Sequence, residues 1–214
     1  MEAIHSHRPN RREARRQDRH DAIVTVASCW FLDHGYAGTS MSAVAAEVGG
    51  SKATLWNYFP SKEDLFSAVI DRAADEFKAR LSVILEPDGE LEPTLRRFCA
   101  SFLEKVTSPR AIALHRLVVG EVGRFPEVGR IFFERAPRRM QALLAAFMAN
   151  AMARGQMRHE DPLGAARTLV GLCMSGCHQQ LLLGIIDEVT PEMVKADADR
   201  AMDLFLRAYL VERG

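Results

Sequence analysis

The sequence has no excess of charge of either sign, because 28 Lys and Arg residues balance 28 Asp and Glu residues. The formal net charge is therefore zero, but the charge is not evenly spread. Positive charge is concentrated at the start, where three acids stand against six arginines: Arg8, Arg11, Arg12, Arg15, Arg16 and Arg19. A basic arm of this kind either touches nucleic acid or is a solvated tail.

Long hydrophobic runs are also absent. The longest uncharged stretch, 168–186, contains Ser175, His178, Gln179 and Gln180. Such side chains are costly in lipid without partners, so we expect a buried helix of a soluble protein and no membrane partner. The first ten residues lack the apolar segment of a secretory signal. Without evidence of secretion, the four cysteines indicate reduced thiols in a cytoplasmic protein: Cys29, Cys99, Cys173 and Cys177.

Patterns typical of catalysis and metal binding are missing as well. No Ser/His/Asp or Cys/His constellation, phosphate-binding glycine loop or metal-ligand spacing rises above chance, so we expect no enzymatic activity, cofactor or metal. Cys173 and Cys177 lie four residues apart on one helical face, but a tetrahedral metal site needs three or four ligands. Packing within an apolar helix is the favoured interpretation of this pair, with redox sensing and metal binding as alternatives.

Strand-like alternation is not found, whereas helical spacing of apolar residues runs through almost the whole chain, which predicts an all-α protein of nine or ten helices. Gly35 suits the C-terminal cap of a first helix, and Ser61–Asp64 is a near capping box that opens a long helix ending before Pro87. Pro137 lies inside the periodic run 127–154, so this helix is either kinked or split. Other helices should start where a proline follows a possible cap: Glu92–Pro93, Ser108–Pro109, Phe125–Pro126, Asp161–Pro162 and Thr190–Pro191.

Two short apolar-periodic segments flank Gly49 and Gly50. Thr39 or Ser40 can cap the first, and Ser51 can cap the second. A short helix, a tight turn containing glycine and a second short helix predict a helix-turn-helix, whose second helix enters the major groove of DNA. Small apolar side chains should hold the two helices at a fixed angle: Val44, Ala45, Val48 and Leu55. Trp56 and Tyr58 either contact phosphate through their polar ring tips or are core aromatics, and Phe59 is expected in the core.

Residues 31–69 contain, in order, aromatic–x–x–x–Gly–Tyr, Thr–Ser, Ala–x–x–x–Gly, Ser–Lys–x–Thr–Leu, Tyr–Phe and Ser–Lys–Glu–x–Leu. In these motifs and their spacing the segment resembles the DNA-binding domain of TetR-type transcriptional repressors. Gly50, Ala53 and Trp56 depart from the usual Val, Gly and Tyr, and Gly50 is expected to loosen the turn. The resemblance implies that these residues bind DNA: Thr39, Ser40, Ser42, Ser51, Lys52, Ala53, Thr54, Trp56, Asn57, Tyr58 and Lys62.

Residues 116–172 are similar to the AefR-like C-terminal subgroup of the same family. The resemblance implies a DNA-binding domain with its basic arm over residues 1–62 and an effector-binding and dimerisation domain over 63–214. It also implies a homodimer on a palindromic operator, with one recognition helix per half-site. The stretch 163–186, read as one helix apolar nearly all round, and the amphipathic last helix favour dimerisation through the last two helices, with a purely intrachain core as the alternative.

A ligand pocket in a helical bundle is mostly apolar with a few polar groups. For each apolar candidate, plain core packing is the alternative interpretation, and for the histidines it is an interior hydrogen bond. The candidate effector-binding residues are Phe98, Phe102, His115, Val118, Glu121, Phe132, Phe133, Met140, Phe147, Met174 and His178.

The leading hypothesis is a one-component regulator that represses transcription and is released from DNA by a small, largely apolar effector. An activator would have the same sequence features. Two further alternatives are a thiol or metal enzyme and a dimeric helical scaffold whose helix-turn-helix, called the reading head below, no longer recognises DNA. Gly50 and the low charge of residues 1–62, eight Lys and Arg against six acids, favour the scaffold.

Overall fold

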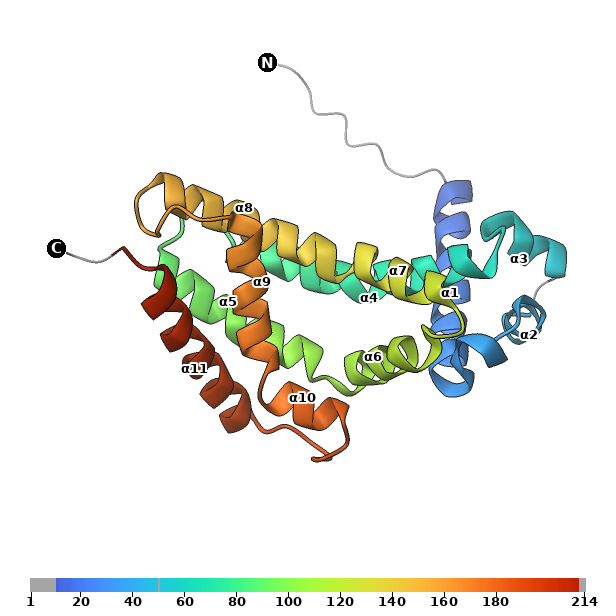
Figure 1. The fold of residues 1–214 in the computed structure, drawn as a ribbon. Helices are drawn as coiled ribbons and strands as arrows, with labels where there is room; N and C mark the ends of the chain where they lie inside the picture. Colours follow the sequence, from blue (N-terminus) through green and yellow to red (C-terminus); the bar gives the residue numbers. More distant parts are fainter. Residues whose placement is uncertain (1–10, 50, 212–214) are drawn as a thin grey trace, which may run out of the picture. The chain divides into compact units, whose positions relative to one another are not determined.

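The computed structural model describes residues 11–49 and 51–211, which form eleven α-helices and one isolated β-bridge, between Met157 and Leu210. The all-α prediction is confirmed, with one helix more than the upper predicted number. In chain order (Figure 1) the helices are α1 (Arg11–Gly38), α2 (Met41–Glu47), α3 (Lys52–Tyr58), α4 (Lys62–Ile84), α5 (Leu91–Val106), α6 (Pro109–Glu121), α7 (Pro126–Arg135), α8 (Pro137–Ala153), α9 (Pro162–Met174), α10 (Cys177–Leu182) and α11 (Pro191–Tyr209).

The chain divides into two compact units after Arg72, inside α4. In the first unit, α1 carries a kink at Gly35, whose φ of 72° places it in the left-handed region that glycine adopts readily. The chain then turns back, so that Tyr36 stacks on Phe31 with ring centroids 5.7 Å apart, and the edge of Phe66 from α4 meets both rings. All three aromatic side chains are buried, and they form the centre of this unit.

The predicted N-terminal caps of three helices are present. Ser40 accepts a hydrogen bond from the backbone N–H of Ala43 and caps α2. Ser51 caps α3 in the same way through Thr54. The hydroxyl of Ser61 accepts a hydrogen bond from the backbone N–H of Asp64 and donates one to the Asp64 carboxylate. These two hydrogen bonds cap the start of α4 in an arrangement related to the capping box.

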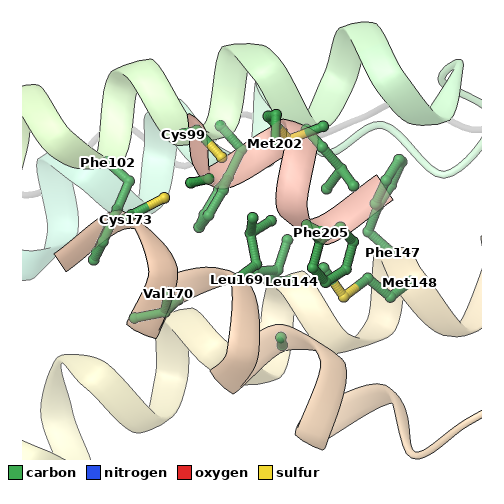
Figure 2. Packing of buried hydrophobic residues seen from close by; sticks show 14 of the residues in the cluster. Cys99, Phe102, Leu144, Phe147, Met148, Leu169, Val170, Cys173, Met202 and Phe205 are labelled. Carbon is green, nitrogen blue, oxygen red and sulfur yellow. The ribbon is translucent and has the colours of Figure 1, made fainter. Parts of the chain in front are cut away.

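In the second unit a single apolar cluster joins α5, α8, α9 and α11 (Figure 2). It is built from residues at helical spacing, so each helix turns one stripe towards the others. Near the end of α11, Arg158 donates through its backbone N–H to Tyr209 and through its side chain to Leu210. Fully buried members of the cluster include Leu95, Phe98, Cys99, Leu103, Leu144, Met148, Leu169, Cys173 and Met202.

Most of the proline-marked helix starts are found where predicted, at Pro109, Pro126, Pro162 and Pro191. The start predicted at Glu92–Pro93 is wrong by two residues, because α5 begins at Leu91 with Glu90 at its N-terminal cap.

Pro137 splits the run 127–154 into α7 and α8 rather than kinking one helix, because proline has no backbone N–H and its ring crowds the preceding turn. The intervening Ala136 has dihedral angles (φ −116°, ψ −77°) that are distorted from those of a regular helix.

The prediction of one helix over 163–186 is wrong. The structure breaks this stretch at Ser175–Gly176, between α9 and α10. The carboxylate of Asp197, on α11, accepts a hydrogen bond from the backbone N–H of Cys177 at 2.6 Å. A side chain twenty residues away thus starts α10 at the break. Among the described helices, none is long and apolar enough to cross a membrane.

Candidate nucleic-acid interface

The α2–α3 pair is held together by small apolar side chains. Val44, Ala45 and Leu55 are buried, while Val48 is partly buried at the end of α2. Gly49 adopts a φ of 71°, a conformation that side chains with a Cβ rarely reach, and this allows the chain to reverse between the helices. Two helices of seven residues each are thereby fixed at one angle.

The opposite side of α3 is polar and exposed. Lys52, Ala53 and Asn57 face solvent, and Trp56 keeps 46% of its surface accessible. Nearly half of the surface of this large apolar side chain is thus open to a partner. A surface that combines a cation, an amide and an indole N–H offers hydrogen-bond donors and stacking area to a polyanion.

The remaining predicted residues of α3 and its cap differ in exposure. Thr54 is partly buried, and its hydroxyl lies 2.8 Å from the hydroxyl of Ser51, which also caps the helix. Tyr58 is partly buried as well, with its ring centroid 6.5 Å from that of His20 on α1. Phe59 is buried, as predicted, and its ring lies 5.0 Å from the same histidine.

Thr39 does not present its side chain to solvent. It is 2% exposed, and its hydroxyl donates to the carbonyls of Trp30 and Gly35, so it ties the end of α1 to the start of α2. The structure thus gives the Thr39 side chain a structural role, and its predicted contact with DNA stays a prediction. Ser40 and Ser42 are exposed at the start of α2. The hydroxyl of Ser40 already accepts the capping hydrogen bond from the backbone N–H of Ala43.

Lys62 begins α4, and its ammonium lies 4.3 Å from the ring centroid of Tyr36. A cation held over an aromatic face keeps its charge while losing rotational freedom. Tyr36 is itself fixed by Phe31 and Phe66. The first unit thus positions one lysine at a helix start through three buried rings.

The candidate effector residues are distributed over different environments. Phe98, Phe102 and Phe147 belong to the apolar cluster of the second unit, with no more than 4% of their surface exposed. They are core residues in this structure. Val118 is also buried, Met140 and Met174 pack partly buried against the cluster, Glu121 is partly buried and Phe133 is 47% exposed.

Three of the predicted residues do meet, from three different helices. The ring of His115 (α6) lies 6.0 Å from that of Phe132 (α7) and 5.6 Å from that of His178 (α10). Burial lowers the pKa of His115, and burial followed by the proximity of His115 lowers the pKa of His178. Both imidazoles are therefore neutral near pH 7, and each then carries one N–H donor and one nitrogen acceptor.

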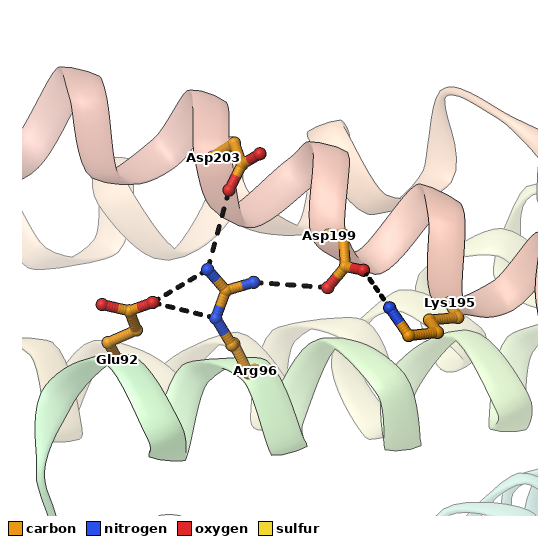
Figure 3. A network of polar contacts seen from close by, with 5 residues as sticks. All are labelled: Glu92, Arg96, Lys195, Asp199 and Asp203. Atoms are coloured by element: carbon orange, nitrogen blue, oxygen red, sulfur yellow. Dashed lines mark hydrogen bonds and ion pairs between the residues drawn. The ribbon is translucent and has the colours of Figure 1, made fainter.

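Sequence reasoning missed a polar cluster between α5 and α11 (Figure 3). Arg96 donates to Glu92 one turn earlier, and it pairs with Asp199 at 3.3 Å and Asp203 at 3.6 Å on α11. Asp199 also accepts from Lys195 at 2.5 Å. The four-residue spacings of Glu92 with Arg96 and of Lys195 with Asp199 were the visible signals, whereas the pairing of Arg96 with α11 joins residues more than one hundred positions apart. A shallow hollow beside this cluster is lined by Arg96, Ala100, Glu104, Pro191, Val194, Lys195, Ala198 and Asp199.

The four cysteines are all in the described part of the chain as free thiols, and only Cys29 is exposed. A hydrogen bond with Cys99 and burial raise the pKa of Cys173, and burial beside Asp197 raises the pKa of Cys177 to about 12. Buried thiols with raised pKa values are poor nucleophiles. Within residues 11–49 and 51–211, no group of three or more His, Cys, Asp or Glu side chains is arranged to hold a metal ion.

Two family models match the chain. Residues 23–69 match the model of the bacterial regulatory proteins of the tetR family. Residues 93–211 match the C-terminal domain of AefR-like transcriptional repressors. The first match contains the α2–α3 pair, and the second contains the apolar cluster of the second unit except for Leu81 and Leu91.

Similar proteins of known structure share this fold over almost their whole length. A TetR-family regulator from Mesorhizobium loti superposes with a TM-score of 0.81 at 25% identity, covering 94% of this chain and 100% of that one. The flavonoid-responsive regulator FrrA superposes with a TM-score of 0.78 at 30% identity, covering 92% and 100%. The transcriptional repressor ComR of Escherichia coli is 40% identical over 60 residues, which are 28% of this chain and 29% of that protein.

Proposed function

This chain belongs to the TetR family of bacterial transcriptional regulators, and from that premise we propose that it represses transcription by binding a palindromic operator as a homodimer. The exposed polar face of α3, opposite the buried contact with α2, carries this proposal. Recognition in the major groove requires a helix that is packed firmly against the protein on one side and carries many hydrogen-bond donors on the other. Lys52, Trp56 and Asn57 supply that second side.

Around this face, Ser42, Ala53 and Tyr58 are proposed to position the helix on the DNA backbone. Contacts to phosphate fix the register of a protein on a duplex, whereas contacts to base edges select the sequence. We assign Lys62 to a phosphate at the start of α4, in keeping with its restrained ammonium.

Dimerisation is proposed to use the C-terminal helices. Leu204 on α11 is 42% exposed, and Leu183 and Ile185, at and after the end of α10, are about 70% exposed (67% and 71%). Apolar side chains in these positions are available to a second copy of the chain, and symmetric dimers bury self-complementary surfaces. Sedimentation should then show a particle of two 23.9 kDa chains, and a Leu204→Arg variant should shift it towards the monomer.

The effector is proposed to be a small, largely apolar compound that binds in the second unit and releases the operator. The cluster of His115, Phe132 and His178 offers one aromatic face and two neutral imidazoles, which suits an apolar ligand with a few hydrogen-bonding groups. FrrA, the relative at 30% identity, is described as flavonoid-responsive. Release requires that the effector bind the DNA-free conformation more tightly than the DNA-bound one.

Fluorescence anisotropy with the DNA upstream of the protein's own gene tests the reading head. The Lys52→Ala/Tyr58→Ala variant should lose saturable binding, while Lys78→Ala, which removes an exposed lysine of α4 in the second unit, should retain it. Circular dichroism of each variant confirms that the helices are intact. Equal, weak binding of that DNA and of random duplex by the unaltered protein, with no effect of the double substitution, would count against operator recognition through α3.

A further inference from the structure

The first turns of α1 carry a stripe of arginines outside the segment that matches the family model. The helix begins at Arg11, whereas the match begins at residue 23. Arg11, Arg15 and Arg19 follow one another at four-residue spacing, with Arg12 and Arg16 beside them. At 3.6 residues per turn these five side chains cover an arc of about 140° on one side of the helix. The basic arm expected from the sequence is thus helical over its described part, and Arg8 lies outside the described residues.

This arrangement is unfavourable for the helix itself. Positive side chains near a helix N-terminus oppose the helix dipole, and like charges four residues apart repel one another. Within the described part of the chain, the side chains of Arg11, Arg15, Arg16 and Arg19 make no hydrogen bond or ion pair. Local helix stability therefore gives no reason for this concentration of charge. A polyanionic partner does, because it removes the repulsion when it binds.

The first turns of α1, which carry the stripe, lead to a contact with the C-terminal end of the recognition helix α3 within the first unit. His20, one turn beyond Arg16, packs its ring 5.0 Å from Phe59 and 6.5 Å from Tyr58, at the C-terminal end of α3. Figure 1 shows the first turns of α1 beside α3. A duplex bound along α3 would therefore continue towards the arginines.

We propose that the arginine stripe of α1, Arg11, Arg12, Arg15, Arg16 and Arg19, is a second DNA-binding surface that neutralises phosphates flanking the half-site read by α3. The partner is the sugar-phosphate backbone of double-stranded DNA. Because the segment is helical, the side chains meet phosphates along the outside of the duplex and do not enter the minor groove as an extended arm would. The proposal rests on DNA binding by the first unit, and it explains how a chain with zero net charge acquires electrostatic affinity.

The salt dependence of binding separates this surface from the reading head. Each neutralised phosphate adds about 0.9 to the slope of log K against log salt concentration, so two arginines lost from each of two subunits lower the slope by about 3.6 at most. We expect Arg15→Gln/Arg16→Gln to lower the slope by more than about 1 on operator and random duplex alike, with the ratio of the two affinities unchanged. The matched control is Arg130→Gln/Arg138→Gln, which removes two exposed arginines from α7 and α8 and should leave the slope unaltered.

Three results would overturn the proposal. The first is a salt slope that is unchanged in the Arg15→Gln/Arg16→Gln variant although its helix content is preserved, and the second is an equal decrease of the slope in the Arg130→Gln/Arg138→Gln control. The third is an Arg15→Gln/Arg16→Gln variant that binds DNA normally and loses only its binding to phosphatidylserine vesicles. The last result would assign the stripe to a membrane surface. Failure of operator recognition is distinguishable, since it would leave random-duplex binding that still depends on Arg15 and Arg16. Conversely, loss of specificity on Lys52→Ala/Tyr58→Ala with no salt effect of the stripe would keep the reading head and reject the second surface.

Discussion

Replacing Gly176 by alanine tests how a distant carboxylate starts α10. The Cβ of an alanine at this position would clash with both carboxylate oxygens of Asp197, because it would lie far inside their van der Waals contact distance. The carboxylate accepts a hydrogen bond from the backbone N–H of Cys177, a buried residue, so it can move only by giving up this bond. We expect Asp197 to rotate away and the hydrogen bond to be lost.

The loss of stability expected for Gly176→Ala follows from the loss of the hydrogen bond between Cys177 and Asp197. A hydrogen bond to a charged group contributes about 1.5–3 kcal/mol, and an N–H group left buried without a partner costs a comparable amount. A loss of about 2.5 kcal/mol in the free energy of unfolding corresponds to a fall in Tm of roughly 5–10 °C, since 1 kcal/mol shifts a domain of this size by about 2–4 °C. Thermal unfolding followed by circular dichroism measures the shift.

A double-mutant cycle gives the sharper assay. Asp197→Ala removes the clash together with the bond, so Gly176→Ala in that background should be nearly neutral, helped slightly by the lower entropy of the unfolded chain. The reasoning is refuted if Gly176→Ala costs the same in both backgrounds, or if it costs less than about 0.5 kcal/mol in the otherwise unaltered protein.

Four further outcomes are expected. Leu55→Ala opens a cavity under α3 and should lower the free energy of unfolding by about 2–5 kcal/mol in chemical denaturation, and a loss below about 1 kcal/mol would show that the α2–α3 contact is loosely packed. Ser51→Ala removes the cap of α3 and should cost about 1 kcal/mol, with Ser51→Asn as a variant that keeps the cap. Arg96→Gln should cost only about 1 kcal/mol or less, and less still at high salt, because its ion pairs are solvent-accessible; a loss that high salt leaves unchanged would argue against an electrostatic role. The pKa values of His115 and His178 are lowered in the folded protein, so the unfolded chain takes up protons first as the pH falls. The free energy of unfolding, measured with urea, should therefore be at its full value above about pH 6.5 and decrease below it. His178→Gln should make this pH dependence weaker.

Local signals in the sequence predicted most helix boundaries correctly. The caps at Ser40, Ser51 and Ser61 need only neighbouring residues, and the same holds for prolines that start helices. The break at Gly176 depends instead on Asp197, which approaches from α11 only after the chain has folded. Periodicity within one segment carries no information about such a contact.

The residues of the candidate interface show the same limit. The alternation of apolar and polar positions in α3 suffices to separate Leu55, which is buried, from Lys52 and Asn57, which are exposed. The burial of Thr39 was not predictable, since its hydroxyl partners belong to the previous helix and to the kink at Gly35. In the second unit, Phe98 has the same local pattern in a core as in a pocket wall, and only packing against other helices distinguishes the two.

The contrast between one exposed and three buried cysteines has a practical consequence. Cys29 lies on α1 in the first unit, whereas Cys99, Cys173 and Cys177 are shielded within the second. A maleimide fluorophore added to the folded protein should therefore attach at a single position without any engineering. The label would report on the first unit alone, and its rotational correlation time and quenching would follow the proposed binding of a DNA duplex, while the second unit stays chemically unmodified.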